Sequence, residues 1–523
     1  MRFIIGKDRK QSALFPVSLE ESIGVENEVR AIDLFVNSLD LEKMGFKVCF
    51  PEGGRPAYHP AVLLKLFIYG YLNRIRSSRN LEKECRRNIE MMWLIEELSP
   101  DHNTIANFRK DNPDAIKRVF RATVQLAKNF NLIGGKIIAG DGTKLRAQNS
   151  KKNNFNTKKI DRHLQYIDHK LEQYTKDLAS ADGEVEREEA QKNIKLHSSR
   201  KEGYEKLQQQ LKETGEPQIS ASDPESRQMV IRGNTTEVAY NVQSTVDAKH
   251  CIPIDYEVTN QNDKKAMGAM VRRAKSILGT TDFTALFDKG YYTGSELGIV
   301  QGLGIKALVA IPDQASTAPD CNYNVQNFTY DQQNDTYTCP EGYQLTTNGK
   351  LYLKYRGTSN QTEFKQYRTK ACKSCPVKNL CTKAKNGKVV ERNTFTPMYE
   401  QNRKNVEEDP ELYLRRQAIV EHPFGTIKRQ WGFDHILSKK GKKRASADVG
   451  FIFIAYNLKR ILCLMGKKGF REVYAQLVIC LFILKETYKA ILTTFYPTDP
   501  VNLIFCPDPG SNLKRLILVH NWR

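Results

Sequence analysis

Three acidic residues are placed where their side chains could carry out chemistry. Asp141 and Asp288 each close a short apolar segment of strand character, and Glu421 lies in a segment expected to be helical that ends in Lys428-Arg429. A carboxylate at the end of a buried strand costs free energy unless a cation neutralises it. Each acid alone is better explained as the water-facing end of an element. Together, on a basic chain, the three predict a divalent-metal site that acts on a phosphodiester.

The overall charge predicts a polyanionic partner. The 523 residues are enough for two to four domains, and they include 81 Lys and Arg against 60 Asp and Glu, a formal charge of +21. Such a surplus is typical of proteins that bind nucleic acid or an anionic membrane. The membrane is disfavoured, because the apolar segments 61–72 and 477–484 are interrupted by Lys65 or too short to span a bilayer.

The N-terminus and the cysteines indicate a cytoplasmic protein. The chain becomes polar within its first eight residues, too soon for a signal peptide. The 11 cysteines are an odd number in a long chain, which favours free thiols or a metal site over a framework of disulfides.

Residues 1–130 are predicted to form a helical N-terminal domain. Helices are expected over 61–72, from 78 through 98 and from 103 to 111, with a tight turn before the last. A turn followed by a helix rich in Thr, Asn and Arg fits a helix-turn-helix DNA reader, in which Arg109 and Lys110 would contact DNA. A helical bundle with a solvated polar face fits equally well.

The pattern changes to strands and helices from residue 131 to residue 311. Strand alternation at 238–246 and 252–258 is followed by an amphipathic helix at 267–278, the strand that ends at Asp288, a helix at 295–301 and a strand at 305–311. This order predicts the first part of an α/β core, a mixed sheet flanked by helices in three layers.

Residues 150–218, inside this core, are predicted to form an antiparallel helical hairpin. Apolar residues recur at spacings of four and three: Ile160, Leu164, Ile167, Leu171, Tyr174 and Leu178. The hairpin could grip DNA, contact a second protomer or serve as a structural arm, and the sequence leaves all three open.

Residues 312–395 are polar, expected to be rich in loops, and contain a candidate zinc site. Cys372 and Cys375 form a Cys-x2-Cys pair, Cys381 follows six residues later and Cys339 precedes them. Four thiolates in such spacing resemble a tetrahedral zinc site. Buried free thiols are the alternative.

The core is predicted to resume over residues 396–465. A helix from 412 to 428 contains Pro423, which lacks the N–H needed in a helix interior and must end or kink the helix. A basic run from 439 to 444 includes Lys442 and Lys443, which fits phosphate contact or a solvated loop. A further helix is expected at 449–462, and the tail 466–523 is unassigned.

Several segments resemble the DDE transposases of bacterial insertion sequences, in the group with an N-terminal helical domain and a cysteine-bearing insertion. The likeness covers roughly residues 50–465, and its motifs are specific together although weak singly. They are Gly140-Asp141-Gly142-Thr143, Tyr240-Asn241-Val242-Gln243, Asp288-Lys289-Gly290-Tyr291, Val420-Glu421-His422-Pro423-Phe424-Gly425 and Asn457-Leu458-Lys459-Arg460.

The resemblance implies an RNase H-like catalytic core. Asp141, Asp288 and Glu421 would be the catalytic residues and would hold two Mg²⁺ or Mn²⁺ ions about 4 Å apart. Lys428 stands at the family spacing, seven residues after Glu421, and would contact DNA near the cut. The family arginine is expected at position 417, which is Gln417, while Arg416 is displaced by one position.

The activity implied is cleavage of double-stranded DNA at the inverted ends of an element and joining of the 3′-hydroxyl ends to target DNA. The family implies a homodimer or larger assembly on DNA, located with the nucleoid in the bacterial cytoplasm. A nuclease of the same fold without strand transfer, and a non-catalytic DNA-binding protein derived from a transposase, are the alternatives.

Overall fold

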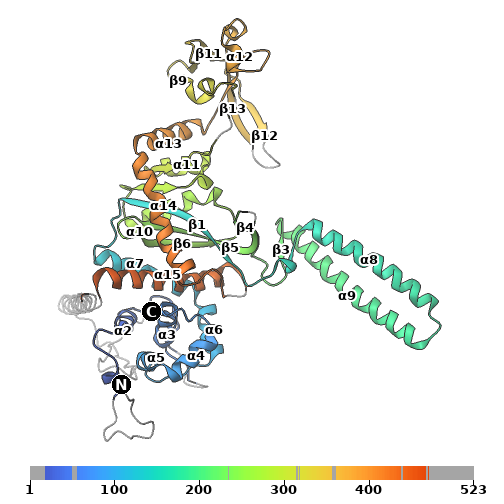
Figure 1. Ribbon diagram of the computed structural model, residues 1–523, viewed down its shortest axis with the longest axis vertical. Helices are drawn as coiled ribbons and strands as arrows, with labels where there is room; N and C mark the ends of the chain where they lie inside the picture. The colour runs from blue at the N-terminus through green and yellow to red at the C-terminus, as the bar shows by residue number, and fades with distance from the viewer. Residues whose placement is uncertain are drawn as a thin grey trace, which may run out of the picture.

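The computed structural model describes residues 18–49, 56–233, 235–313, 316, 318–355, 361–437, 440–466 and 469. An α/β core lies at the centre, with a helical region, a long helical arm and a small β-domain around it (Figure 1). The expected tail, 466–523, lies almost wholly outside the described residues.

Short helices make up the N-terminal region. They are α1 (Leu19–Ser22), α2 (Glu28–Asn37), α3 (Pro60–Leu72), α4 (Ser78–Arg87), α5 (Ile89–Leu94), α6 (His102–Asp111) and α7 (Pro113–Asn129). The helix expected from 78 through 98 is divided in two, because the Asn88 side chain accepts hydrogen bonds from the backbone N–H groups of Glu90 and Met91 and caps a new helix.

The core sheet is mixed, as predicted. Its strands are β1 (Ile137–Arg146), β4 (Arg227–Arg232), β5 (Thr235–Asp247), β6 (Ile252–Thr259), β7 (Thr284–Phe287) and β8 (Lys306–Val309). The order is β4-β5-β1-β7-β8, with β6 also beside β5. β1 is antiparallel to β5 and parallel to β7.

Helices cover both faces of this sheet. Adjacent residues of one strand, such as Ile138 and Ala139, belong to different apolar clusters because strand side chains alternate between faces. One face packs against α7, α10 (Met267–Leu278) and α15 (Lys442–Met465), and the other against α14 (Pro410–Phe424). The helices α11 (Gly294–Gly302) and α13 (Thr396–Glu408) lie beside β8.

The segment that carries Glu421 continues beyond Pro423 as a different helix. After α14, the residues Gly425–Gln430 form a π-helical turn, in which the Trp431 N–H donates to the carbonyl of Thr426. Pro423 has no N–H to donate, and a wider turn is one way for a helix to continue past such a gap. The basic residues Lys442 and Lys443 lie in the first turn of α15 rather than in a loop.

Two helices, α8 (Thr157–Ser180) and α9 (Glu184–Thr214), form the arm that projects from the core (Figure 1). They pack along their length, with Ile160 and Ile167 of the apolar seam buried between them. A two-stranded sheet of β2 (Asn154–Phe155) and β3 (Ile219–Ser220) closes the base of the arm.

The cysteine-rich region contains a sheet where loops were expected. Its strands are β9 (Thr329–Asp331), β10 (Thr336–Thr338), β11 (Gln344–Thr347), β12 (Tyr352–Tyr355), β13 (Gln361–Arg368) and β14 (Val390–Asn393). The short helix α12 (Lys378–Cys381) lies between β13 and β14 in the chain. The core is small and largely aromatic, including Tyr337 and Tyr367. Apart from β13, these strands have only three or four residues, too few to give a readable alternation in the sequence.

A buried ion cluster joins the N-terminal helices to α15, and it corrects the prediction for Arg109. The Asp448 carboxylate lies 2.5 Å from Arg76 Nη2 and 3.3 Å from Arg109 Nη1, and it accepts a hydrogen bond from the Tyr71 hydroxyl. Burial raises the pKa of Asp448, but the two guanidinium groups outweigh burial and hold it below its ordinary value. Arg109 is only 8% exposed, so its charge serves the core and is not presented to DNA.

Candidate active site

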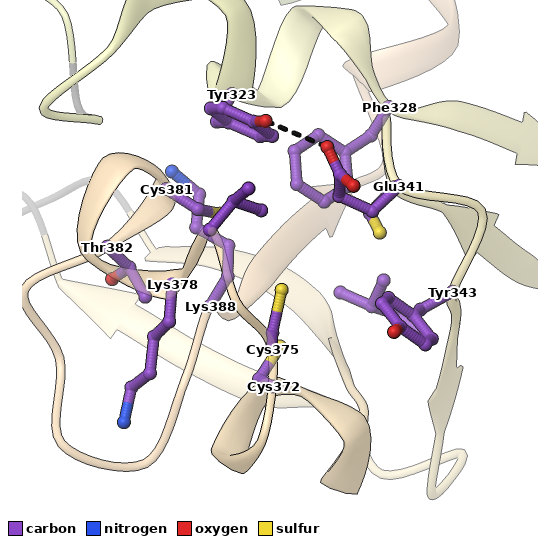
Figure 2. A pocket seen from close by; sticks show the side chains of 13 residues that line it. Tyr323, Phe328, Glu341, Tyr343, Cys372, Cys375, Lys378, Cys381, Thr382 and Lys388 are labelled. Atoms are coloured by element: carbon purple, nitrogen blue, oxygen red, sulfur yellow. Dashed lines mark hydrogen bonds between the residues drawn. The ribbon is translucent and has the colours of Figure 1, made fainter.

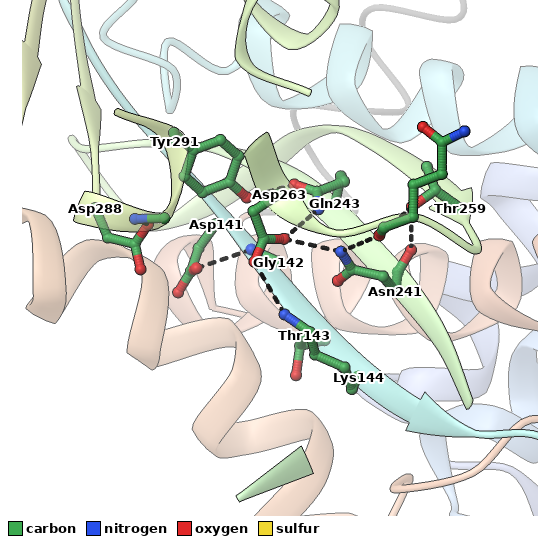
Figure 3. Close-up of polar contacts among 12 residues, drawn as sticks. Asp141, Gly142, Thr143, Lys144, Asn241, Gln243, Thr259, Asp263, Asp288 and Tyr291 are labelled. Atoms are coloured by element: carbon green, nitrogen blue, oxygen red, sulfur yellow. Dashed lines mark hydrogen bonds and ion pairs between the residues drawn. The ribbon is translucent and has the colours of Figure 1, made fainter. Parts of the chain in front are cut away.

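The pairing of β1 with β7 brings Asp141 and Asp288 together. The two parallel strands pair Ile137 with Thr284 and Ala139 with Leu286, a constant offset of 147 positions. The same offset separates Asp141 from Asp288 (288 − 141 = 147), so the two residues continue one register across adjacent strands. Figure 3 shows their carboxylates on the same side of the sheet.

Helix α14 places a cation beside this pair. Ile419 and Val420 anchor the helix on the sheet against Leu286. The Arg416 Nη1 atom lies 3.9 Å from the Asp141 Oδ2 atom, and among the described residues it is a buried atom without a hydrogen-bond partner. Arg416 therefore reaches the site although it is displaced by one position from the family spacing.

Glu421 occupies another side of the same helix. Consecutive helical residues point about 100° apart, and Val420 already faces the sheet. The Glu421 side chain is exposed, and its Oε1 atom accepts a hydrogen bond from Gln417 Nε2 at 2.8 Å. Within the described ranges, no three His, Cys, Asp or Glu side chains are arranged to hold a metal ion. A metal-binding role for Glu421 stays a prediction.

Lys428 reaches β1 from the π-helical turn. Its Nζ atom donates hydrogen bonds to Thr143 Oγ1 at 3.1 Å and to the Lys144 carbonyl at 3.3 Å. Thr143 is two residues beyond Asp141 on the same strand. Burial lowers the pKa of Lys428. The lysine thus lies against β1 just beyond Asp141, and its contact with DNA near the cut stays a prediction.

A third carboxylate, Asp263, lies behind the pair and was missed from the sequence. It accepts hydrogen bonds from Asn241, Gln243 and Lys144 (Figure 3). Its position after β6, on the turn Asp263–Lys265, gives no periodic signal. The Tyr240–Gln243 motif was the available clue, since it places two amide side chains on the same face of β5.

The electrostatic state of Asp141 suits a metal ligand. Burial is the largest cause that raises its pKa to about 6, and the negative charges of Asp288 and Asp263 act in the same direction. Arg416 and the backbone N–H of Gly142 oppose the shift without cancelling it. Two close carboxylates with incompletely balanced charge are hard oxygen donors, the kind that Mg²⁺ and Mn²⁺ prefer.

The four candidate zinc ligands converge in the β-domain. Cys339, Cys372, Cys375 and Cys381 are free thiols that line one apolar void of about 20 Å³, large enough for a single small ion or water (Figure 2). Burial raises the pKa of Cys381, and the other three thiols add to the shift. The four thiols are not arranged as metal ligands in the described structure, and zinc binding by them stays a prediction.

Two of the remaining DNA-contact candidates, Lys110 and Lys443, lie around a basic hollow, and the third, Lys442, does not line it. Lys110 and Lys443 line it together with Arg118, Lys440 and Arg444. Lys443 is 2.8 Å from Asp114, and Lys442 points to Glu225 at 3.6 Å. Contact with DNA at these residues, and a helix-turn-helix function for the N-terminal helices, stay predictions.

Two family models match the chain. A transposase domain (DUF772) matches residues 17–111, and a transposase DDE domain matches residues 338–462, the part that contains Glu421 and Lys428. The chain belongs to the DDE transposases of insertion sequences. No curated protein matches this transposase.

One solved structure matches over much of the length. It is a piggyBac transposase synaptic complex with hairpin DNA, matched over 87% of this chain and 80% of that chain at 9% identity and a TM-score of 0.26. A similarity this low carries no structural argument. Among the described residues of the transposase, no helix is long and apolar enough to cross a membrane.

The contribution of Asp141 to the free energy of unfolding of the metal-free transposase should fall as pH rises from about 4 to about 6. In this window folded Asp141, with a pKa of about 6, retains a proton that the unfolded chain, with a pKa of 3.8, has released. Asp141→Asn removes this contribution, so the variant should be more stable than the wild type at neutral pH in the presence of a chelator.

Urea unfolding at a series of pH values measures the effect. Asp282→Asn is the matched control, because Asp282 is an exposed carboxylate paired with exposed Lys136 and should change little. A stability difference between Asp141→Asn and wild type that stays constant from acid to neutral pH would contradict the prediction.

Proposed function

We propose that this transposase binds the inverted ends of an insertion sequence, hydrolyses phosphodiester bonds there and joins the freed 3′-hydroxyl ends to target DNA. The observation that carries the proposal is the register of Asp141 and Asp288 on adjacent strands, with Arg416 and Lys428 beside them. Carboxylates with incompletely balanced charge, next to cations that suit a phosphate, fit phosphoryl transfer better than a purely structural role.

The topology supports an RNase H-like core. Five strands follow one another in the chain as β1, β5, β6, β7 and β8. Across the sheet they lie in the order β6-β5-β1-β7-β8, so the first strand in the chain is at the centre, next to the fourth. The first three are antiparallel and the last two continue in parallel from the first. In such a sheet the first and fourth strands are neighbours, which is where Asp141 and Asp288 lie.

Each side chain of the candidate site has a separate proposed role. Asp141 and Asp288 would hold two Mg²⁺ or Mn²⁺ ions, which when bound supply Lewis acidity for the attacking and leaving oxygens. Glu421 would complete the ligand set after giving up its bond to Gln417. Arg416 and Lys428 would neutralise phosphate oxygens near the cut, and Arg416 has a buried Nη1 atom without a partner among the described residues.

Asp288→Asn should abolish DNA cleavage and joining while leaving binding to the element's ends largely intact, because the substitution removes a metal ligand and little surface. The assay incubates protein, Mg²⁺ and a duplex carrying the terminal repeat, and it follows both the products and the gel shift. Asp313→Asn, a fully exposed carboxylate nearby in sequence, is the control and should behave as wild type.

The outcomes separate three functions. Joined products from the wild type support the transposase reaction, nicks alone indicate a nuclease, and a shift without cleavage indicates a DNA-binding protein only. Equal losses of cleavage and end binding in Asp288→Asn would count against its role as a metal ligand.

We also propose that the four cysteines of the β-domain bind one structural Zn²⁺. Their convergence on a single ion-sized void supports this. Purified protein should contain about one zinc per chain, and Cys375→Ser should lose it and unfold at lower temperature. Cys321→Ser is the control, because Cys321 is an exposed thiol in the same region that does not line the void. Zinc-free protein with all four thiols reactive would refute the proposal.

We propose, finally, that the arm contacts a second copy of the transposase within a homodimer or larger assembly. Residues 157–214 contain 12 Lys and Arg and 12 Asp and Glu, so the arm has no part in the +21 charge of the chain. A neutral arm is poorly suited to the DNA backbone, which attracts excess positive charge. It also exposes Tyr166, Val185 and Leu196.

Replacing residues 158–213 by a short glycine linker should lower the molar mass of the protein in solution from that of an oligomer to that of a monomer. Light scattering measures the mass, and circular dichroism checks that the core remains folded. Retention of the oligomeric mass by a folded, armless protein would contradict this role.

A further inference from the structure

Asp263 is held by side chains from two strands of the active site. Its Oδ1 atom accepts hydrogen bonds from Asn241 Nδ2 at 2.8 Å and Gln243 Nε2 at 2.6 Å, both on β5. Its Oδ2 atom accepts from Lys144 Nζ at 3.0 Å, on β1. A carboxylate is an acceptor only, so it can receive three donors at once, which an asparagine cannot.

The carboxylate is pressed against β1 directly beside Asp141. A Cβ atom on Gly142 would lie 2.4 Å from Asp263 Oδ1, 2.7 Å from Gln243 Nε2 and 2.8 Å from Asn241 Oδ1. A side chain at position 142 would have to displace these three groups, so glycine is what allows Asp263 to lie this close to β1. The backbone that carries Asp141 is thereby fixed against Asp263.

Gln243 extends the connection to Asp288. The Tyr291 hydroxyl donates to Gln243 Oε1, and Tyr291 is fully buried in the turn Lys289–Tyr291. The same turn holds Asp288, whose Oδ1 atom accepts from the Gly290 N–H at 2.8 Å. A continuous path of hydrogen bonds thus runs from Asp263 to the turn that orients Asp288 (Figure 3).

An unused acceptor lies at the same place. Asn241 Oδ1 is buried without a hydrogen-bond partner in the part of the chain that the structure describes, and it is directed at Gly142. Gly142 and Asp141 are consecutive residues of β1 and face opposite sides of the sheet, so this acceptor belongs to the network around Asp263, behind the carboxylate pair.

We infer that Asp263 is a positioning residue of the transposase: together with Gln243 and Tyr291 it fixes the separation and orientation of Asp141 and Asp288 toward divalent metal. The inference rests on the proposed function of that pair. Asp263 acts through its partners on the two strands, and its own oxygen atoms are occupied by Asn241, Gln243 and Lys144.

Asp263→Asn in the full-length protein tests the inference. Both the concentration of Mn²⁺ that half-saturates cleavage and the concentration that half-saturates thermal stabilisation should rise about 10- to 100-fold, the usual cost of losing a residue that orients metal ligands. Binding of DNA ends without metal should not change. The thermal readout reports metal binding independently of catalysis.

Asp255→Asn is the matched control. Asp255 is also a buried aspartate, on β6, and it is paired with Arg121 at 2.8 Å and Arg273 at 2.5 Å away from the carboxylate pair. Its loss should lower the melting temperature but leave the Mn²⁺ dependence as in wild type. A purely structural role for Asp263 predicts the same behaviour for both variants.

The outcomes are distinguishable. Wild-type Mn²⁺ dependence in folded Asp263→Asn overturns the inference while the proposed function stands. Should Asp263→Asn not fold, Tyr291→Phe, which removes only the hydroxyl link to Gln243, must raise the Mn²⁺ requirement, and an unchanged requirement overturns the inference. Wild-type protein without metal-dependent cleavage or stabilisation overturns the proposed function and the inference with it.

Discussion

The parallel pairing of β1 with β7 is the constraint on which the active site depends. Apolar residues set it: Ile138 and Ala285 pack on one face of the sheet, Ala139 and Leu286 on the other. Because both faces are covered by helices, a shift of register by one residue would move apolar side chains between two different cores. The pairing therefore holds two carboxylates together against their mutual repulsion.

The N-terminal helices are attached to this core by burial and charge together. Phe67 of α3 stacks on Phe451 of α15 with ring centroids 4.6 Å apart, close to the cluster of Asp448 with Arg76 and Arg109. Removing any partner of such a cluster leaves a buried charge uncompensated, so the docking geometry is strongly specified. The part of the chain that matches the DUF772 transposase domain is thus fixed relative to α15 and the sheet that it covers.

Local patterns in the sequence predicted the elements well and the side-chain environments poorly. The sequence located α10 by its one buried face and by Gly279 at its end, and it located α3 and β7 as short apolar segments that are buried almost throughout. The same reasoning placed Arg109 on a DNA-facing surface. Its partner, the Asp448 carboxylate, is 339 positions away in the chain, and local sequence cannot reveal such a pairing. Asp263 was invisible for a similar reason: its partners come from other strands.

The position of Glu421 illustrates the limit further. The sequence gives its spacing from Lys428, but the face it occupies depends on how α14 lies on the sheet. Val420 and Ile419 occupy the buried side, and Arg416, rather than Glu421, is the charged residue that the helix presents to Asp141. Only the tertiary packing decides between neighbouring residues 100° apart on a helix.

The positive charge of the whole chain does not remove the cost of ionising Asp141 at the candidate site. The chain carries +21, which attracts DNA from a distance. At the site, Lys144 balances Asp263, Arg416 lies 3.9 Å from Asp141 and Lys428 is bonded to Thr143, yet burial and the neighbouring carboxylates still raise the pKa of Asp141 to about 6. A DNA phosphate that approaches Asp141 and Asp288 would be repelled by their negative charge. Under the proposed function, divalent cations at the pair would supply the missing positive charge, which would account for two partly buried, poorly balanced carboxylates in a basic protein.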